Sequence, residues 1–316
     1  MRTFLIAASA LLSACALAPL AAAETPVQPV DLLLTSATVV DVEKGTTTPD
    51  QLVAVRGGDI VAVGPEGEAG RYRAVRTLDL GDRYVMPGLW DMHVHFGGGE
   101  TLIEENAELM PLYVVNGVVA VRDAAGDLAQ QVLDWRASPP TADAPRIFTS
   151  GPKIEGIAPV WKGVIETGSE ADVDAALDRL QALRVDFVKI TDNTLTPELF
   201  LYAVREAKKR CMKTSAHIPA SITVLTAAEA GLSSIEHLDY AMKAGSRDEA
   251  AIAADYLAGK YTYAQTMRRY ADTFDVETAR RVYARLAELG TAVSPTLYGS
   301  TTLANLDLDD HSHDEG

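Results

Sequence analysis

Two histidines one residue apart are the first feature that could carry chemistry. His93 and His95 close the segment 86–95, whose apolar strand begins just after Pro87-Gly88. On a strand, residues i and i+2 point to the same side, so both imidazoles can reach one point in space. Neutral imidazole is a common protein ligand for zinc and similar ions. The pattern favours a metal site; the alternative is a polar loop end with two unrelated histidines.

Three further residues lie in or at the end of later strand-like segments. Lys189 lies inside 185–190, and His217 and His237 close 213–217 and 233–237. A lysine in such an apolar segment is costly to bury as a cation, so we expect a lowered pKa or a chemical modification. The alternatives are a lysine whose amine reaches water at a strand edge and two histidines with structural roles.

Strands and helices alternate from residue 84 onward, which predicts an α/β domain with a parallel sheet or barrel. We predict helices over 102–116, 247–271 and 276–289, a helix capped by Ser169, and a helix opened by Thr196-Pro197. The predicted strands are 86–95, 117–123, 146–151, 185–190, 212–217, 232–237 and 290–297. Barrel enzymes place their sites where such strands end.

Residues 30–83 predict a separate small β unit. Short strands are expected at 31–34, 38–41, 52–55, 60–63 and 74–80. The Gly-rich segment 56–59 suits a tight hairpin between the third and fourth of these.

The segment Pro87-Gly88-Leu89-Trp90-Asp91-Met92-His93-Val94-His95 resembles the first-strand signature of the metal-dependent amidohydrolases, in particular the imidazolonepropionase-like and prolidase-like branch. The resemblance implies a (β/α)₈ TIM-like barrel over 84–316, with 30–83 as the N-terminal half of a β-sandwich. Seven barrel strands are found, so strand 8 is missing and the sequence is expected to be incomplete relative to the family.

The same resemblance implies a set of metal ligands. His93 and His95 would hold one divalent ion, His217 and His237 the second, and a carbamate formed from CO₂ on Lys189 would join them. Zinc is the default ion, although manganese, iron or cobalt would fit. The family also uses an aspartate at the end of strand 8, for which Asp307, Asp309 and Asp310 in the polar tail are poor candidates.

Such a centre would activate water for attack on an amide, peptide or cyclic amide. The predicted function is therefore hydrolysis of carbon–nitrogen bonds in a small-molecule substrate. Dipeptides ending in proline or a basic residue, N-acyl amino acids and cyclic amides all stay open. The alternative is a truncated, inactive relative that only binds metal or a partner.

Five further residues are weaker candidates. Asp123 and Glu236 could support the ligands or serve packing, and alternation along the strand places Glu236 opposite to His237. Tyr240 could donate to a substrate oxygen, but an exposed loop tyrosine is the favoured interpretation. His311 and His313 repeat the spacing of the first pair in an acidic tail that we expect to be solvated.

Composition bounds the partners and the compartment. The 316 residues carry a formal charge of −16, so a nucleic-acid partner is not expected. Residues 1–23 have the pattern of a signal peptide, which predicts a periplasmic or secreted protein. Alternatively, the sequence around Cys15 resembles a lipobox, which would anchor the protein to a membrane. Because Cys15 lies in this leader in both cases, Cys211 would have no disulfide partner within the chain. A monomer and a homo-oligomer both stay open.

Overall fold

The computed structural model describes residues 26–138, 141–306 and 308. The chain divides into two compact units, and the boundary in the sequence falls between Pro87 and Gly88. The predicted signal peptide over 1–23, the lipobox at Cys15 and the tail histidines His311 and His313 lie outside the described residues. Among the described residues, no helix is long and apolar enough to cross a membrane.

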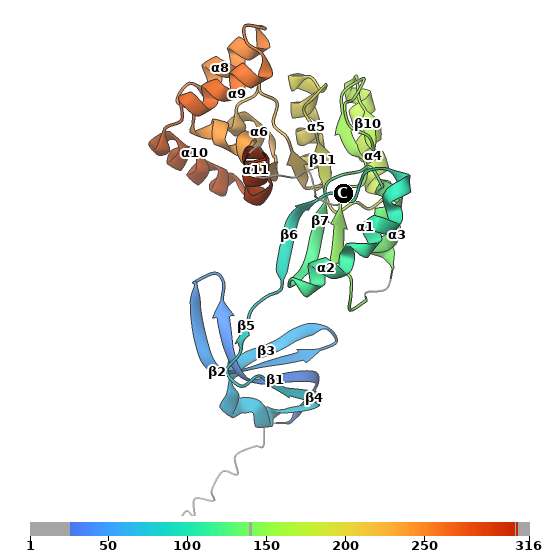
Figure 1. Cartoon of the computed structure of the whole chain (residues 1–316), viewed down its shortest axis with the longest axis vertical. Coiled ribbons are helices and arrows are strands. Elements are labelled where there is room, and N and C mark those ends of the chain that lie inside the picture. Colours follow the sequence, from blue (N-terminus) through green and yellow to red (C-terminus); the bar gives the residue numbers. More distant parts are fainter. Residues whose placement is uncertain (1–25, 139–140, 307, 309–316) are drawn as a thin grey trace, which may run out of the picture. The chain divides into compact units, whose positions relative to one another are not determined.

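Unit 1, shown in blue in Figure 1, is built around one sheet in the order β3-β2-β1-β4, with β5 also paired to β1. Its elements are β1 (Gln28–Asp41), β2 (Thr46–Arg56), β3 (Asp59–Pro65), the 3₁₀ helix η1 (Glu66–Arg71), β4 (Tyr72–Asp79) and β5 (Tyr84–Val85). The predicted hairpin at 56–59 joins β2 to β3, and Gly57 and Gly58 take φ values of 62° and 87° there. The predicted strands 31–34 and 38–41 are one strand, β1, whose pairing with β2 is irregular near Ser36.

Unit 2 contains two parallel sheets. The first has the order β6-β7-β8, and the second has the order β10-β9-β11-β12-β13-β14. The strands are β6 (Leu89–Val94), β7 (Val118–Asp123), β8 (Arg146–Thr149), β9 (Lys153–Glu155), β10 (Val164–Glu166), β11 (Val188–Ile190), β12 (Thr214–Ala216), β13 (Ser234–Glu236) and β14 (Ala292–Ser294). All seven predicted barrel strands are present, and β9 and β10 were not predicted.

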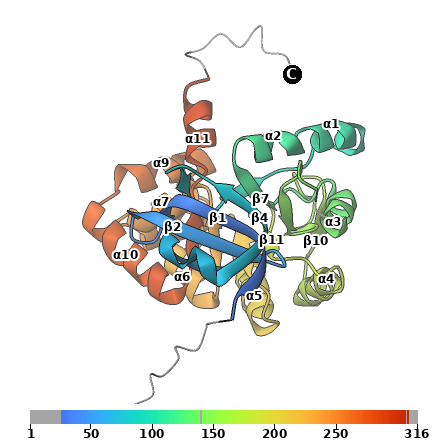
Figure 2. The ribbon, with the colours of Figure 1, turned by 90° about the horizontal axis from the view of Figure 1, so that it is seen from below.

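Helices follow most of these strands and flank them (Figure 2). They are η2 (Glu100–Leu102), α1 (Ile103–Glu108), α2 (Met110–Val115), α3 (Ala129–Ala137), α4 (Glu170–Ala182), α5 (Pro197–Lys209), α6 (Val224–Ala230), α7 (Leu238–Met242), η3 (Lys243–Gly245), α8 (Glu249–Leu257), α9 (Tyr263–Asp272), α10 (Val276–Leu289) and α11 (Leu297–Ala304). Ser169 and Thr196 cap α4 and α5 through their hydroxyls, as predicted. The predicted helix 247–271 is wrong: it is divided into α8 and α9, with Gly259 between them at φ 71°.

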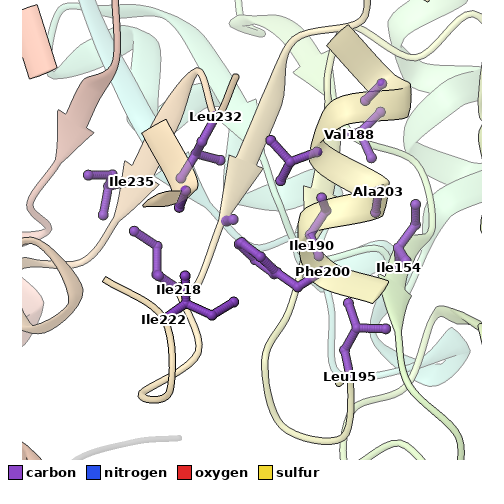
Figure 3. Close-up of a cluster of buried hydrophobic side chains, with 14 of the residues drawn as sticks. Ile154, Val188, Ile190, Leu195, Phe200, Ala203, Ile218, Ile222, Leu232 and Ile235 are labelled. Carbon is purple, nitrogen blue, oxygen red and sulfur yellow. The ribbon is translucent and has the colours of Figure 1, made fainter. Parts of the chain in front are cut away.

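The largest core of unit 2 lies between the second sheet and its helices (Figure 3). Ile154, Val188, Ile190 and Ile235 project from the strands, and Phe200 from α5 packs among them, all fully buried. This packing fixes the positions of β11, β12 and β13, and therefore of the residues that follow them. The α/β class with parallel strands is confirmed. Of the described strands, β6 and β14 each pair with one neighbour, and closure of a barrel stays a prediction.

Candidate metal centre

The carboxyl ends of β6, β12 and β13 bring four histidines together. Nε2 of His93 lies 3.1 Å from Nε2 of His95, and Nε2 of His217 lies 3.1 Å from Nε2 of His237. The two pairs adjoin, since the ring centroids of His93 and His237 are 4.6 Å apart. Residues separated by more than 140 positions in sequence therefore form one imidazole cluster, made of two pairs.

Lys189 lies in β11, which pairs with β12, the strand that ends just before His217. Its side chain is buried, and its Nζ is the one buried side-chain nitrogen or oxygen in the described part of the chain without a hydrogen-bond partner. Burial lowers the pKa of Lys189 to about 7. Its charge also contributes to lowering the pKa values of His95, His217 and His237, so the amine lies within electrostatic range of the histidine cluster.

Their surroundings favour the neutral form of His95, His217 and His237. Burial, followed by the neighbouring positive charges, lowers the pKa of His217 to about 4 and that of His237 to about 3. The pKa of His95, the most exposed of the four, is lowered for the same reasons. Neutral imidazole is the form that binds metal, so these shifts suit a ligand set.

The donor set fits divalent ions. Two nitrogens bound to one tetrahedral zinc at about 2.0–2.1 Å are separated by about 3.3 Å, close to the spacing within each pair. Among the described residues, no three histidine, cysteine, aspartate or glutamate side chains form a complete ligand group. Each pair therefore needs a further ligand, and an unpartnered buried amine that can become an anionic carbamate is suited to that need.

Glu236 supports His93. Its Oε2 lies 2.6 Å from His93 Nδ1, while Oε1 accepts hydrogen bonds from Ser215 and Ser234 at 2.7 and 2.6 Å and pairs with Arg122. Burial alone would raise the pKa of Glu236, but the hydrogen bond from His93 and the charge of Arg122 hold it well below its usual range. This carboxylate directs Nε2 of His93 toward the cluster.

The prediction that Glu236 and His237 point to opposite sides is wrong. His237 has φ 64° and ψ 146°, so the strand alternation stops there. Glu236 and His237 consequently both contact His93. A non-glycine residue with these backbone angles is strained by about 1–3 kcal/mol, and the surrounding contacts must offset this cost.

Asp192, Tyr240 and Thr296 complete the surroundings. Asp192 Oδ1 lies 3.6 Å from His217 Nδ1, and Thr296 Oγ1 lies 2.9 Å from His237 Nδ1. Tyr240 stacks on His217 with a centroid distance of 5.0 Å and donates a hydrogen bond of 3.1 Å to Asp192. The expectation of an exposed loop tyrosine is wrong, because α7 carries this half-buried ring back over the histidine. Asp192 and Thr296 were missed, although Asp192 lies two residues past the predicted strand 185–190 and Thr296 lies inside the predicted strand 290–297.

Asp123 holds the chain beyond the first histidine pair. Its fully buried carboxylate accepts hydrogen bonds from the backbone N–H of Phe96 at 3.1 Å and from Thr149 Oγ1 at 2.9 Å. Burial raises its pKa to about 6. Asp123 therefore ties the end of β6 to β7 and β8. The tail candidates Asp307, Asp309 and Asp310 lie outside the described residues.

Comparison with curated proteins finds deaminases. The chain is 26% identical to an adenine deaminase of Ruegeria pomeroyi over 162 residues, covering 45% of this chain and 26% of the relative. It is 27% identical to a 5-methylthioadenosine/S-adenosylhomocysteine deaminase of Nitratidesulfovibrio vulgaris over 186 residues, covering 58% and 33%. The chain thus spans a third or less of the length of these relatives. No protein-family model matches it.

Comparison with solved structures finds peptide and amide hydrolases. An ochratoxinase of A. niger superposes with a TM-score of 0.58 at 16% identity, covering 84% of this chain and 75% of the other. A Xaa-Pro dipeptidase with bound methionine gives a TM-score of 0.55 at 21% identity, covering 83% and 78%. A prolidase complexed with N-methylphosphonate-L-proline gives 0.54 at 17% identity, covering 84% and 77%.

Proposed function

We propose that the chain belongs to the amidohydrolase superfamily and carries the metal centre of an enzyme that hydrolyses carbon–nitrogen bonds. The observation that supports this most directly is Lys189, a buried amine without a hydrogen-bond partner whose charge acts on His95, His217 and His237. A lysine in a strand usually extends its amine to solvent. The amine of Lys189 is buried and does not reach solvent. Reaction with CO₂ would convert it into a ligand.

The proposed ligands are His93 and His95 for one divalent ion, His217 and His237 for the other, and Lys189 as a bridging carbamate. Two such ions, zinc by default, would lower the pKa of a bound water and polarise a substrate carbonyl. The surrounding residues orient the ligands: Glu236, Thr296 and Asp192 lie beside the Nδ1 atoms of His93, His237 and His217. Each Nε2 is thereby left facing the cluster.

The substrate is proposed to be a small molecule with a carbonyl-linked nitrogen. The structural neighbours that act on Xaa-Pro dipeptides favour a dipeptide, with N-acyl amino acids and cyclic amides as related choices. The curated relatives favour a second candidate, hydrolytic deamination of a purine base or nucleoside. Both reactions use an activated water at a carbon–nitrogen bond.

Metal analysis tests the centre. We expect the full chain, reconstituted with zinc and bicarbonate, to retain about two ions, and Lys189→Met to retain fewer. The matched control is Lys213→Met, which removes an exposed lysine from the neighbouring strand segment. Turnover of Xaa-Pro dipeptides, N-acyl amino acids, cyclic amides and adenine would then be compared with and without a chelator.

The two readouts separate the alternatives. Wild-type protein that binds no metal after this treatment would contradict the proposed centre. Metal binding without turnover of any substrate would favour the alternative function, a relative that only binds metal or a partner.

Export is a separate proposal, based on the apolar pattern of residues 1–23. N-terminal sequencing of the protein made in a bacterial host would find Glu24 first if a signal peptidase cuts after Ala23. A lipid-modified Cys15 at the N-terminus would instead support the membrane-anchored form.

A further inference from the structure

A cavity of about 800 Å³ adjoins the histidine cluster. The segments that follow β11 and β12 form one wall, and residues from α7 to the start of α9 form the other. Asp192 and Tyr240 belong to both features, because they line the cavity and also contact His217. A molecule that occupied this cavity would lie beside the metal centre of the proposed function.

The cavity has a distinctive chemical lining. Four tyrosines face it, namely Tyr240, Tyr256, Tyr261 and Tyr263. Of the described residues that line it, Asp192 is the one carboxylate, and none is lysine, arginine or histidine. The described lining therefore offers aromatic faces and one negative charge, and it has no cationic side chain to pair with an anion.

The charges and rings around the cavity also favour a cation. Burial, and then the carboxylates of Asp192 and Asp239, raise the pKa of Tyr263. The rings of Tyr256 and Tyr263 meet edge to face with centroids 6.5 Å apart. Tyr261 already holds a cation, since the guanidinium carbon of Arg269 lies 3.9 Å from its ring centroid. Tyrosine faces attract cations through the ring quadrupole, and a nearby carboxylate adds to this attraction.

We infer that this tyrosine cavity binds a cationic group of the substrate, such as a primary ammonium or a guanidinium, next to the bond that is hydrolysed. The inference rests on the proposed function for its catalytic meaning. It narrows the substrate class to amides that carry a positively charged group. Substrates whose corresponding group is a carboxylate are disfavoured, because Asp192 would repel it.

Calorimetric titration of the metal-loaded full chain tests binding without requiring turnover. The probes are 2-phenylethylammonium and 2-phenylethanol, which share a phenyl group and differ in charge. We expect the ammonium to bind about tenfold more tightly than the alcohol. Equal or tighter binding of the alcohol would overturn the inference.

Variants locate the binding. Tyr256→Leu keeps an apolar side chain but removes the π face, so the preference for the ammonium should fall several-fold. Asp192→Asn should lower the same preference further. The matched control Tyr84→Leu removes an exposed tyrosine from unit 1 and should leave the preference unchanged. A preference that survives both cavity substitutions would place the cation elsewhere and overturn the inference.

Hydrolysis separates this inference from the proposed function. If substrates are cleaved, amides bearing lysine should exceed their norleucine counterparts in kcat/KM by about tenfold, chiefly through KM. Cleavage without this preference would overturn the inference and leave the proposed function standing. Selective binding of the ammonium without cleavage of any substrate would support the cation site and contradict the proposed hydrolytic function.

Discussion

At the scale of single residues, the candidate centre depends on partners that orient its imidazoles. His93 would be free to rotate if Glu236 did not hold Nδ1 at 2.6 Å. Glu236 is in turn fixed by Ser215, Ser234 and Arg122, which come from three different strands. One carboxylate thus links the first sheet to the second at the point where the histidines meet.

Glu236→Gln should weaken metal binding while preserving side-chain volume. The neutral amide cannot stabilise the His93 ring in the same way, and substitutions of such supporting groups reduce metal affinity by about 10- to 100-fold. Zinc affinity would be measured by competition with a chromophoric chelator. Glu277→Gln, on the surface of α10, is the control. Equal affinity of wild type and Glu236→Gln would show that Glu236 has no orienting role.

The burial of Asp123 predicts that the free energy of unfolding depends on pH. Its pKa is about 6 in the folded protein, because of burial, and 3.8 when unperturbed. A raised carboxyl pKa gives stability that is complete below the unfolded value and is lost as pH rises through the folded value. Between about pH 3 and about pH 8 the wild type should therefore lose about 3 kcal/mol relative to Asp123→Asn, which does not titrate. Urea unfolding of both proteins across this range measures the difference, and a constant difference would refute the argument.

At the scale of elements, periodicity and capping predicted much of unit 2. Ser169 and Thr196 cap their helices because short hydroxyl side chains accept from the free N–H groups of a first turn. The seven predicted barrel strands are also present, because buried parallel strands are short apolar segments between helices. Lys189, His217 and His237 were found for the same reason, as polar residues in or just after such segments.

The features that were missed depend on backbone geometry or on tertiary contacts. Nothing in the order of residues shows that His237 takes φ 64°, so alternation placed Glu236 on the wrong side. Tyr240 looked like a loop residue because α7 has only five residues, too few to show a helical period. Asp192 and Thr296 gained meaning only when the strand ends were brought together.

Lys243 connects the helices after β13 to the segment after His217. Its fully buried Nζ donates to the carbonyl oxygens of Ile218 and Pro219 at 3.2 and 2.7 Å. The hydroxyl of the buried Tyr270 donates to Ala220 O at 2.7 Å. η3 and α9 thus fix the three residues that follow a proposed metal ligand.

Lys243→Met should destabilise the protein and loosen His217. Each buried carbonyl that loses its donor costs about 1–3 kcal/mol, so a loss of roughly 2–4 kcal/mol is expected. Urea unfolding gives the free energy, and a chelator competition gives the zinc affinity, which should also fall. Lys260→Met removes a lysine from a surface ion pair with Asp255 and should change neither quantity by much. A stable Lys243→Met variant with unchanged zinc affinity would contradict this positioning role.

At the scale of the whole molecule, the described strands of unit 2 leave apolar residues at two sheet edges. β6 pairs only with β7, and β14 pairs only with β13, within the described residues. Leu89, Trp90 and Met92 on β6 and Val293 on β14 are each 38–50% exposed. Exposed strand edges with apolar side chains are places where sheets add further strands.

We therefore predict that the 316-residue chain self-associates through these edges. Sedimentation velocity over a range of concentrations should show reversible assembly, together with binding of an apolar fluorescent dye. The double variant Leu89→Lys/Val293→Lys places a charge on each edge and should remain monomeric. Val276→Lys, which changes a more exposed apolar residue on α10, should assemble like the wild type. Assembly that persists in the double variant would show that another surface mediates it. A wild type that stays monomeric would contradict the prediction, because both edges would then be stable when exposed to water.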